Sequence, residues 1–535
     1  MKDPAASVPA ASKAAAFVKE TTEQVRHLEK AYYLAEWEAA LSGSEQALRR
    51  VREAQAAYLG FWSDPHRFQT ARQLDEAGSD DPLITRQLRM IYLTAARGQQ
   101  EPSLIGQLTE LESRVRGRYY NYRACVDGRE LSDNQIDEIL RNSRDSEQLR
   151  KAWEASKRVG AEVAEEVREM ARLRNASARV QGYRDHFQQS LELDEIDERE
   201  LFDVFDDLER RSESPFEKLK AEIDEALCSR FALPPEQLRP WHYGDRYFQK
   251  GPALGEADLD SLFEGRELEA LARDTYRGLD LEVESILSRS DLYPRPGKNQ
   301  HAFCIHIDRE GDIRTLNNLQ ATHRWAETLL HELGHGVYER YLDPQLPWLL
   351  RAPAHTFTTE AVAILMGSLT LDPRWYTEVL ELPSTQAQAL TEAALRNDRA
   401  GKLIFTRWCL TMTHFERRLY ADPDADLDAI WWEYVERFQL LKRPERRKAP
   451  DWAAKIHVAL FPVYYHNYQL GHLLAAQIRD CLERQAGGIV GLPAAGRWLI
   501  ERIFAPGARV DWRSLVEGAT GEPLNVRRFM DSLGG

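Results

Sequence analysis

Apolar residues recur at helical spacing along most of the chain. Between residues 14 and 42 they return every third or fourth position, Gly43 interrupts the pattern, and Ser44 is a suitable N-cap for a second helix that continues to Leu59. Ser132 and Ser146 are further candidate N-caps. The same pattern predicts helices over 83–96, 103–122, 146–180, from Asp197 toward Cys228, over 385–420 and over 426–438. The sequence therefore predicts an all-α protein.

One short segment departs from the helical pattern. Between Lys298 and Leu316, β-forming residues flank a turn that contains Gly311, which predicts a β-hairpin. Such a small sheet within a helical chain has an edge strand. We expect this edge to be able to pair with the backbone of an extended peptide.

Composition restricts the class of protein and its partners. The chain has 535 residues, of which 43% are hydrophobic and 29% charged, as is typical of soluble globular proteins. The formal net charge of −15 and the lack of a long basic run argue against nucleic acid and anionic membranes as partners. No run of the sequence reaches the ~20 apolar residues that a membrane span needs.

Cysteine usage and the N-terminus bear on the compartment. The five cysteines are scattered and form no CxxC motif, which favours a reducing environment over a disulfide framework. Residues 1–16 lack the apolar core of a signal peptide. We therefore expect a cytoplasmic protein, or a periplasmic or secreted one if a leader has been removed, and a monomer, with a dimer as the alternative.

The most informative motif is His331-Glu332-Leu333-Gly334-His335, an HExxH within a predicted helix that Thr322 can cap. Residues four apart lie on one helical face, so the two imidazoles can bind one metal ion while Glu332 lies beside it as a general base. An amphipathic helix with two exposed histidines is the non-functional alternative. Gly334 and Gly336 each weaken the helix by up to about 1 kcal/mol, which a close backbone approach would explain.

A third metal ligand is available 25 residues after His335. Glu360 lies in the first turn of an almost wholly apolar helix, with Thr358 or Thr359 as its candidate N-cap. A carboxylate there is costly unless it is paired or binds a metal, although a simple capping role is the alternative. Together, His331, His335 and Glu360 predict a site for one Zn²⁺ ion with a fourth position open to water, and hence a zinc hydrolase.

A later segment holds candidate oxyanion donors. Tyr465 and Tyr468 are three residues apart on one helical face, and His457 precedes them. A hydroxyl or imidazole there can donate a hydrogen bond to an oxyanion. As core aromatic residues they would need no catalytic function.

In these motifs the chain resembles the angiotensin-converting-enzyme family of zinc peptidyl-dipeptidases, as a bacterial-type single-domain member. The resemblance covers residues from about 240 to 470, and the helical N-terminal half is compatible with it. Besides the HExxH motif, it rests on short segments that agree in order, which are Gly244–Gln249, His301-Ala302, Arg351 with Glu360-Ala361, Trp431-Trp432, Lys455-Ile456-His457 and the pair Tyr465 and Tyr468.

The resemblance implies a fold and an activity. The fold would be a predominantly helical, two-lobed ellipsoid with a deep central channel, formed by a single catalytic domain over 1–535. Lid-like helices would occupy 14–125, and the active site would lie within 240–480. The activity would be the release of C-terminal dipeptides from short peptides.

The resemblance also implies roles for individual residues. Glu332 would take a proton from the attacking water, and His457 and Tyr468 would stabilise the tetrahedral intermediate. His301 and Ala302 would hold the peptide backbone. The free C-terminal carboxylate would be bound by Gln249, Lys455 and Tyr465.

Three departures qualify the resemblance. The family usually has an acidic residue four positions after the ligand glutamate, which supports a zinc histidine, and Ile364 stands there instead. Asn467 replaces an arginine associated with chloride activation, so we expect weak or no dependence of activity on chloride. One extra residue follows His335 and another follows His457. These shifts also resemble the oligoendopeptidase and thimet-oligopeptidase families, which leaves endo-cleavage of short peptides as the alternative.

A helical zinc-binding scaffold without catalysis is the alternative of another class.

Overall fold

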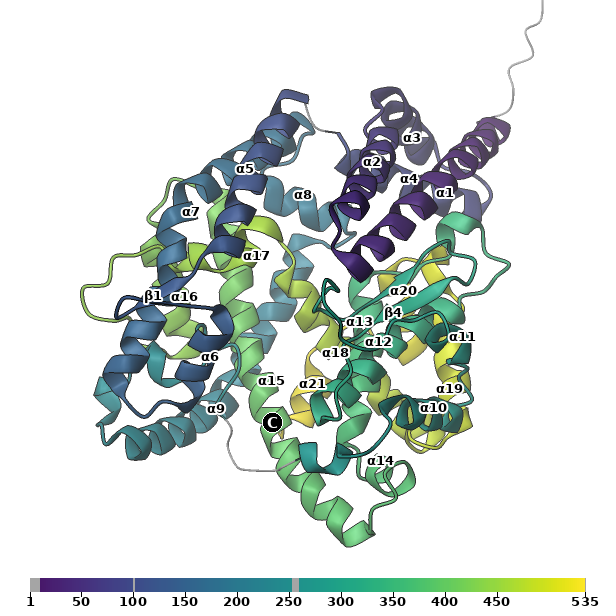
Figure 1. Ribbon diagram of the computed structural model, residues 1–535. Coiled ribbons are helices and arrows are strands. Elements are labelled where there is room, and N and C mark those ends of the chain that lie inside the picture. The colour runs from purple at the N-terminus through teal and green to yellow at the C-terminus, as the bar shows by residue number, and fades with distance from the viewer. Residues whose placement is uncertain (1–9, 100–101, 253–258, 535) are drawn as a thin grey trace, which may run out of the picture. The chain divides into compact units, whose positions relative to one another are not determined.

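The computed structural model describes residues 10–99, 102–252 and 259–534. Helices dominate these residues, and their only strands form two antiparallel two-stranded hairpins (Figure 1). The prediction of an all-α fold with a small hairpin is confirmed. The chain divides into two compact units. The prediction that residues 1–535 form a single catalytic domain with lid-like helices over 14–125 stays a prediction. The first unit comprises Met1–Gln99, Asp258–Thr391 and Leu470–Asn525, and the second comprises Gln100–Ala257, Glu392–Gln469 and Val526–Gly535.

The first unit contains the N-terminal helices, one hairpin and the HExxH helix. Its helices are α1 (Ala10–Ser42), α2 (Glu45–Trp62), α3 (Pro65–Ala77), α4 (Pro82–Arg97), α10 (Leu268–Gly278), α11 (Glu284–Leu287), α12 (His323–Arg340), α13 (Thr356–Gly367), α14 (Pro373–Glu378), α19 (Pro493–Leu499) and α20 (Trp512–Thr520). Its strands are β3 (Phe303–His306) and β4 (Ile313–Leu316).

The second unit is built from longer helices. They are α5 (Pro102–Asn121), α6 (Asp133–Asn142), α7 (Ser146–Val180), α8 (His186–Leu193), α9 (Glu198–Phe231), α16 (Leu427–Gln439), α17 (Ile456–Leu460) and α21 (Arg527–Ser532), together with the strands β1 (Ala124–Val126) and β2 (Arg129–Leu131). The unit boundaries after Thr391 and Gln469 fall within α15 (Ser384–Ala421) and α18 (Tyr465–Ala486).

Most predicted helix starts are confirmed. Ser44, Ser132, Asp197 and Thr322 each cap their helix through a side-chain oxygen that accepts a backbone N–H. The prediction for Ser146 is wrong, because the carboxylate of the preceding Asp145 accepts the N–H groups of residues 147 and 148 and caps α7.

The N-cap predicted for the helix of Glu360 is also wrong. The ring of His355 accepts the N–H of Phe357 at 3.1 Å, so α13 begins at Thr356 and not after Thr358 or Thr359. Glu360 is therefore the fifth residue of α13. Its carboxylate lies beyond the N-cap position, which excludes the simple capping role.

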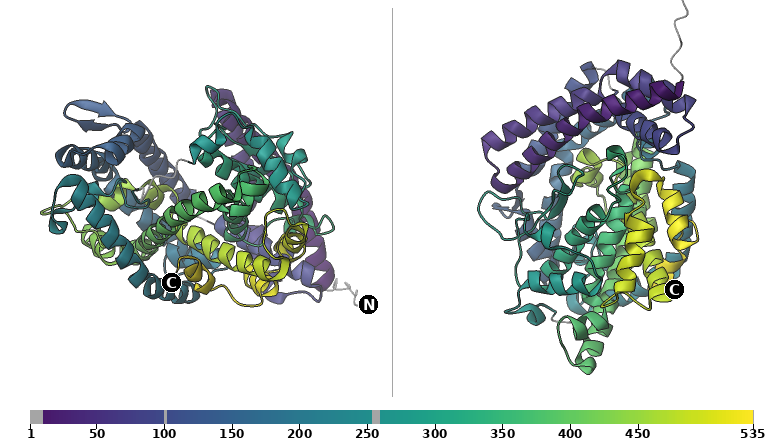
Figure 2. Two further views of the ribbon diagram at one scale, coloured as in Figure 1. Left: turned by 90° about the horizontal axis from the view of Figure 1, so that it is seen from below. Right: turned by 90° about the vertical axis from the view of Figure 1, so that its right-hand side faces the viewer.

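The N-terminal helices pack on the β3–β4 hairpin. α1 and α2 lie side by side (Figure 2), and Trp37 of α1 joins Ile307 and Leu316 in one apolar cluster. Beside this cluster, Arg309 makes two hydrogen bonds, of 2.6 and 3.0 Å, to the buried carboxylate of Glu29. The hairpin is thereby held from one side by α1.

The hairpin has a defined register and a second support. Phe303 pairs with Leu316, and His306 pairs with Ile313. The Nδ1 of His306 lies 2.9 Å from a carboxylate oxygen of Glu339 in α12. β3 is therefore fixed to the helix that carries the HExxH motif.

In the second unit, a strained turn precedes α18. Val463 has a φ of 54°, which is unfavourable for a β-branched residue, and its N–H donates a 2.8 Å hydrogen bond to the buried carboxyl group of Glu416. Tyr465, the first residue of α18, follows two positions later. Glu416 thus supports the turn from which the predicted tyrosines Tyr465 and Tyr468 emerge.

Among the described residues, none of the helices combines the length and apolar character needed to cross a membrane.

Ionisation of Glu416 should lower the free energy of unfolding as the pH rises. Burial raises the pKa of its carboxyl group to about 8, against the opposing effects of the Val463 N–H and the Arg174 charge. The folded protein therefore keeps a proton that the unfolded chain releases above its ordinary pKa of 4.5, so the stabilising contribution is complete below pH 4.5 and is lost as the pH rises to about 8.

We expect Glu416→Gln, which cannot ionise but retains an acceptor for Val463, to remove this dependence. Its thermal midpoint should match the unmodified protein at pH 5 and exceed it by a few degrees at pH 8.5. Glu433→Gln, at an exposed position of α16, is the matched control and should show no such gain. Equal midpoints of the Glu416→Gln variant and the unmodified protein at both pH values would contradict the assignment.

Candidate metal centre

The two histidines of the HExxH motif lie on the same face of α12. The ring centroids of His331 and His335 are 5.0 Å apart, one helical turn from each other. Both side chains retain part of their exposure, 27% and 19%, so an ion from solvent can reach them. The predicted pairing of the two imidazoles is therefore present in the structure.

Helix α13 brings the third ligand to this face. One carboxylate oxygen of Glu360 lies 3.7 Å from Nε2 of His331, and the other lies 3.7 Å from Nε2 of His335. One ligand atom from each of the three residues lies within 4.8 Å of the other two. Ligand atoms about 2.1 Å from a tetrahedral zinc ion are about 3.4 Å from one another, so only a small adjustment would complete the coordination.

The close packing of α12 on α13 depends on glycine. A Cβ on Gly334 would lie only 2.9 Å from the Ala363 Cα, and a Cβ on Gly367 would lie 3.3 Å from the Glu327 carbonyl oxygen. A Cβ on Gly471 of α18 would lie 3.1 Å from the Glu360 side chain. The close backbone approach suggested by the glycines of the HExxH helix therefore occurs, and at Gly334 it is an approach to the helix of Glu360.

The electrostatics of the three residues favour a bound cation. Burial lowers the pKa of His331 to about 4, and burial together with His331 lowers that of His335 to about 3, so both imidazoles are neutral at pH 7 with a lone pair available. Burial raises the pKa of Glu360 to about 7. A divalent cation compensates the charge of this carboxylate, and two imidazoles with one carboxylate are a ligand set that suits zinc.

Glu332 lies next to this site and is 7% exposed. Burial, and secondarily the nearby Glu360, raise the pKa of its carboxyl group to about 8. Cys304 of β3 is a neighbour, because the carboxyl groups of Glu332 and Glu339 add to the effect of burial in raising the pKa of its thiol. The predicted general base is therefore near both Glu360 and the thiol of Cys304 in β3.

His335, one of the two predicted zinc ligands in α12, has a hydrogen-bond partner that the sequence did not identify. Nδ1 of His335 lies 2.7 Å from the hydroxyl oxygen of Thr359, the residue before Glu360. Ile364, at the position where the resembling family has an acidic residue, packs instead toward Gly471 of α18. The sequence offered Thr359 only as an N-cap, and no local pattern indicated its contact with α12.

The predicted peptide-binding residues of the first unit adjoin β3. His301 is exposed and its backbone N–H donates to the side chain of Asn299, while Ala302 directly precedes the strand. The described structure pairs β3 with β4 along one edge. The role of His301 and Ala302 in holding a peptide stays a prediction.

In the second unit, the structure brings together Gln249 and Lys455. The Lys455 ammonium donates a 2.9 Å hydrogen bond to the Gln249 side-chain oxygen and lies 5.0–5.6 Å from the ring centroids of Tyr247, Trp408 and Tyr465. Burial lowers the pKa of Lys455 to about 8. Among the described residues no carboxylate lies within ion-pair distance of this ammonium, and the charge of Asp245, which acts on it from farther away, only partly offsets the effect of burial.

The remaining predicted residues form an aromatic group in the same unit. The ring centroids of His457 and Tyr465 are 5.0 Å apart, and those of Tyr465 and Tyr468 are 5.5 Å apart. Burial, with a smaller contribution from Lys455, lowers the pKa of His457 to about 4. The buried Nδ1 of His457 has no hydrogen-bond partner among the described residues. Their joint action with the metal-binding residues of the first unit stays a prediction.

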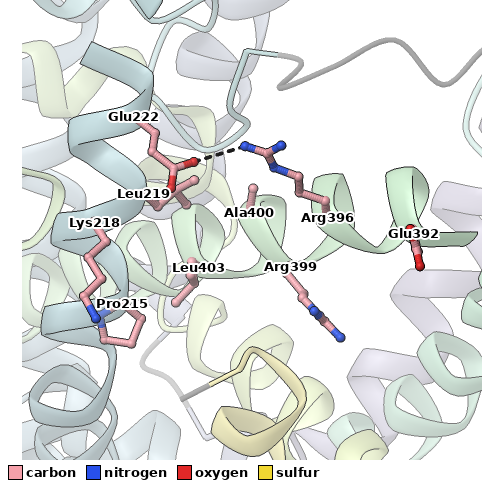
Figure 3. A pocket seen from close by; sticks show the side chains of 9 residues that line it. All are labelled: Pro215, Lys218, Leu219, Glu222, Glu392, Arg396, Arg399, Ala400 and Leu403. Atoms are coloured by element: carbon pink, nitrogen blue, oxygen red, sulfur yellow. Dashed lines mark hydrogen bonds and ion pairs between the residues drawn. The ribbon is translucent and has the colours of Figure 1, made fainter. Parts of the chain in front are cut away.

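A separate concave surface lies between α9 and α15 of the second unit (Figure 3). An ion pair of 3.3 Å joins Glu222 and Arg396 there, while Lys218 and Arg399 lie exposed beside apolar residues of the two helices. None of the predicted site residues lines it. We assign this surface no role in the chemistry.

The close contact at Gly334 generates a prediction. Gly334→Ala should force α12 and α13 apart, because the new methyl group would meet a backbone atom, and should thereby weaken zinc binding and destabilise the fold by about 1–3 kcal/mol. The measurements are zinc affinity by competition with a chelator and the thermal midpoint of the metal-free protein.

Gly336→Ala is the matched control on the same helix. Its methyl group would meet mainly the flexible end of the Ile286 side chain at 3.0 Å, and alanine favours a helix over glycine by up to about 1 kcal/mol. We expect its zinc affinity to be unchanged. Unaltered zinc binding by the Gly334→Ala variant would show that the close contact is not needed for the site.

Comparisons with known proteins agree with this geometry. The model described as peptidase family M3 matches residues 139–535, which include the HExxH motif and Glu360 and make up well over half of the chain. The model described as angiotensin-converting enzyme matches residues 8–232, and the curated proteins searched contain no match. The predicted relationship to that family is confirmed, and it is carried by the N-terminal helices, for which the sequence offered no motif. The chain belongs to peptidase family M3 and is a metallopeptidase of the zinc-dependent type related to angiotensin-converting enzyme.

Proposed function

We propose that this protein hydrolyses short peptides at a zinc centre formed by His331, His335 and Glu360, and that it releases C-terminal dipeptides. The observation that carries the hydrolytic part is the convergence of these three ligand atoms beside Glu332. The observation that supports dipeptide release is the buried Lys455 ammonium, which lacks a carboxylate partner in the described residues.

A zinc ion bound by these three residues would polarise the scissile carbonyl group and lower the pKa of a water molecule. Glu332 accepts the proton that the attacking water loses and donates it to the leaving amine. Burial raises the pKa of Glu332, and the positive charge of a bound zinc ion would oppose that shift, so the carboxyl group could both accept and release a proton near neutral pH. The partly exposed His331 and His335 leave the site accessible to the peptide.

The second unit contributes donors in this proposal. His457 is neutral at pH 7 because its pKa is low, so it donates a hydrogen bond without bringing a charge. Tyr468, on the first turn of α18, is the second donor to the oxyanion. His301 and Ala302 bind the peptide backbone at the edge of β3.

The specificity for a free C-terminus rests on charge. A substrate carboxylate would form an ion pair with the Lys455 ammonium, and Gln249 and Tyr465 would be further hydrogen-bond donors to it. A peptide without that carboxylate leaves the buried ammonium uncompensated, which penalises internal cleavage. The compact aromatic surroundings of Lys455 strengthen this preference because they exclude water.

Cleavage within short peptides is the second candidate. It is favoured by the extra residues after His335 and His457, and by the end of the angiotensin-converting-enzyme match at residue 232, before Gln249 and every other residue on which dipeptide release depends. The two candidates share the metal site and the role of Glu332. They differ only in what binds the C-terminal end of the substrate.

The hydrolytic role is tested by Glu332→Gln. We expect kcat to fall by a factor of about 10²–10⁴, since the amide cannot accept the proton, while zinc content stays at one per chain. Zinc content is measured by metal analysis alongside turnover. Zinc binding without turnover in the unmodified protein would instead favour the non-catalytic scaffold.

The specificity is tested with an unblocked peptide and its C-terminally amidated twin, with products identified by mass. We expect dipeptides from the free acid only, and we expect Lys455→Met to raise KM for that peptide by about tenfold or more. Lys442→Met, at an exposed position of the same unit, is the control and should leave KM unchanged. Internal fragments from both peptides would identify an oligoendopeptidase.

A further inference from the structure

A histidine that binds zinc through Nε2 must carry its proton on Nδ1. Whichever group accepts that proton in a hydrogen bond fixes both the tautomer and the orientation of the ring. In His335, Nε2 lies toward Glu360, at 3.7 Å from a carboxylate oxygen, whereas Nδ1 lies 2.7 Å from Thr359 Oγ1. The two nitrogen atoms therefore face two different partners on the same helix.

We propose that Thr359 is the positioning residue of the metal centre, which accepts the Nδ1 proton of His335 and so commits Nε2 to the metal. This inference rests on the zinc site of the proposed function, and it concerns a residue to which neither the motif nor the family comparison assigns a role. A carboxylate is the common partner in such a place, and Ile364 cannot supply one.

One turn of α13 contributes both the residue that orients His335 and the ligand Glu360. Thr359 and the ligand Glu360 are consecutive residues of α13, and both approach His335 of α12. Because a β-branched side chain has few χ1 rotamers, the hydroxyl oxygen of threonine is held in place more firmly than that of serine. The helical turn that supplies the ligand Glu360 therefore also orients the imidazole of His335.

The choice of a hydroxyl group has a chemical consequence. A carboxylate partner raises the basicity of the imidazole, whereas a neutral hydroxyl group does not. The proton then stays on Nδ1, and the zinc ion is held by a neutral ligand. The dependence on Thr359 should therefore appear in metal affinity, before any step of catalysis.

The test is the zinc affinity of the full chain, measured by competition with a chelator and zinc sulfate. Thr359→Val keeps the shape and β-branching of the side chain but removes the acceptor, and we expect zinc binding to weaken by about tenfold or more. Thr359→Ser restores an acceptor and should recover most of the affinity. Thr356→Val, at an exposed position of the same helix, is the matched control and should bind zinc as the unmodified protein does.

The thermal midpoint of the metal-free proteins separates positioning from a structural role. We expect the metal-free midpoint of Thr359→Val to match that of the unmodified protein, and only its increase on adding zinc to shrink. Equal zinc affinity of Thr359→Val and the unmodified protein would overturn the proposal, as would a failure of serine to recover affinity. A loss of affinity in Thr359→Val without any peptidase activity of the unmodified protein would leave this inference intact and overturn the proposed function.

Discussion

In the first unit, the backbones of α12 and α13 approach so closely at Gly334 and Ala363 that the space does not admit a Cβ. This contact sets the separation of the two helices and hence the 3.7 Å distances from Glu360 to His331 and His335. Two packed helices hold a ligand set more rigidly than a loop can, since neither helix moves without disturbing the core. The helix-weakening glycine is therefore a requirement of the site.

Each unit also contains buried ionisable groups whose charge the folded chain does not fully compensate. In the first unit, Glu360 and Glu332 are carboxyl groups whose burial is unfavourable unless a cation joins them. In the second unit, Lys455 is a buried ammonium that donates a hydrogen bond to the neutral amide of Gln249. In the proposed function, a metal ion would compensate the carboxyl groups of the first unit, and the carboxylate of a peptide would pair with the ammonium of the second.

The parts of the site that depend on local spacing were predictable from the sequence. His331 and His335 are one helical turn apart, and Glu360 was identified because a carboxylate in an apolar helix needs a partner. The N-cap of α13 was missed because a histidine ring, and not a threonine hydroxyl, accepts the first N–H groups. The β1–β2 hairpin was also missed, although Asp127-Gly128 is a common two-residue turn and both residues have positive φ.

Contacts between distant segments could not be predicted in the same way. The hydrogen bond between His335 and Thr359 exists only because α13 packs on α12 at one particular separation. The rings around Lys455 come from residues 247, 408 and 465, and no pattern in the sequence links them. The strained Val463 and its support by Glu416 likewise depend on tertiary packing, which overrides the local preference of valine.

X-ray absorption spectroscopy of the zinc-loaded protein can identify the residues that bind the metal, because it reports the atoms in the coordination shell. We expect two imidazole nitrogen atoms and carboxylate oxygen in the shell at about 2.0–2.2 Å, with no sulfur. Cys304 lies near Glu332 and is the natural competitor. A zinc–sulfur distance of about 2.3 Å, or a shell without imidazole, would contradict a site formed by His331, His335 and Glu360.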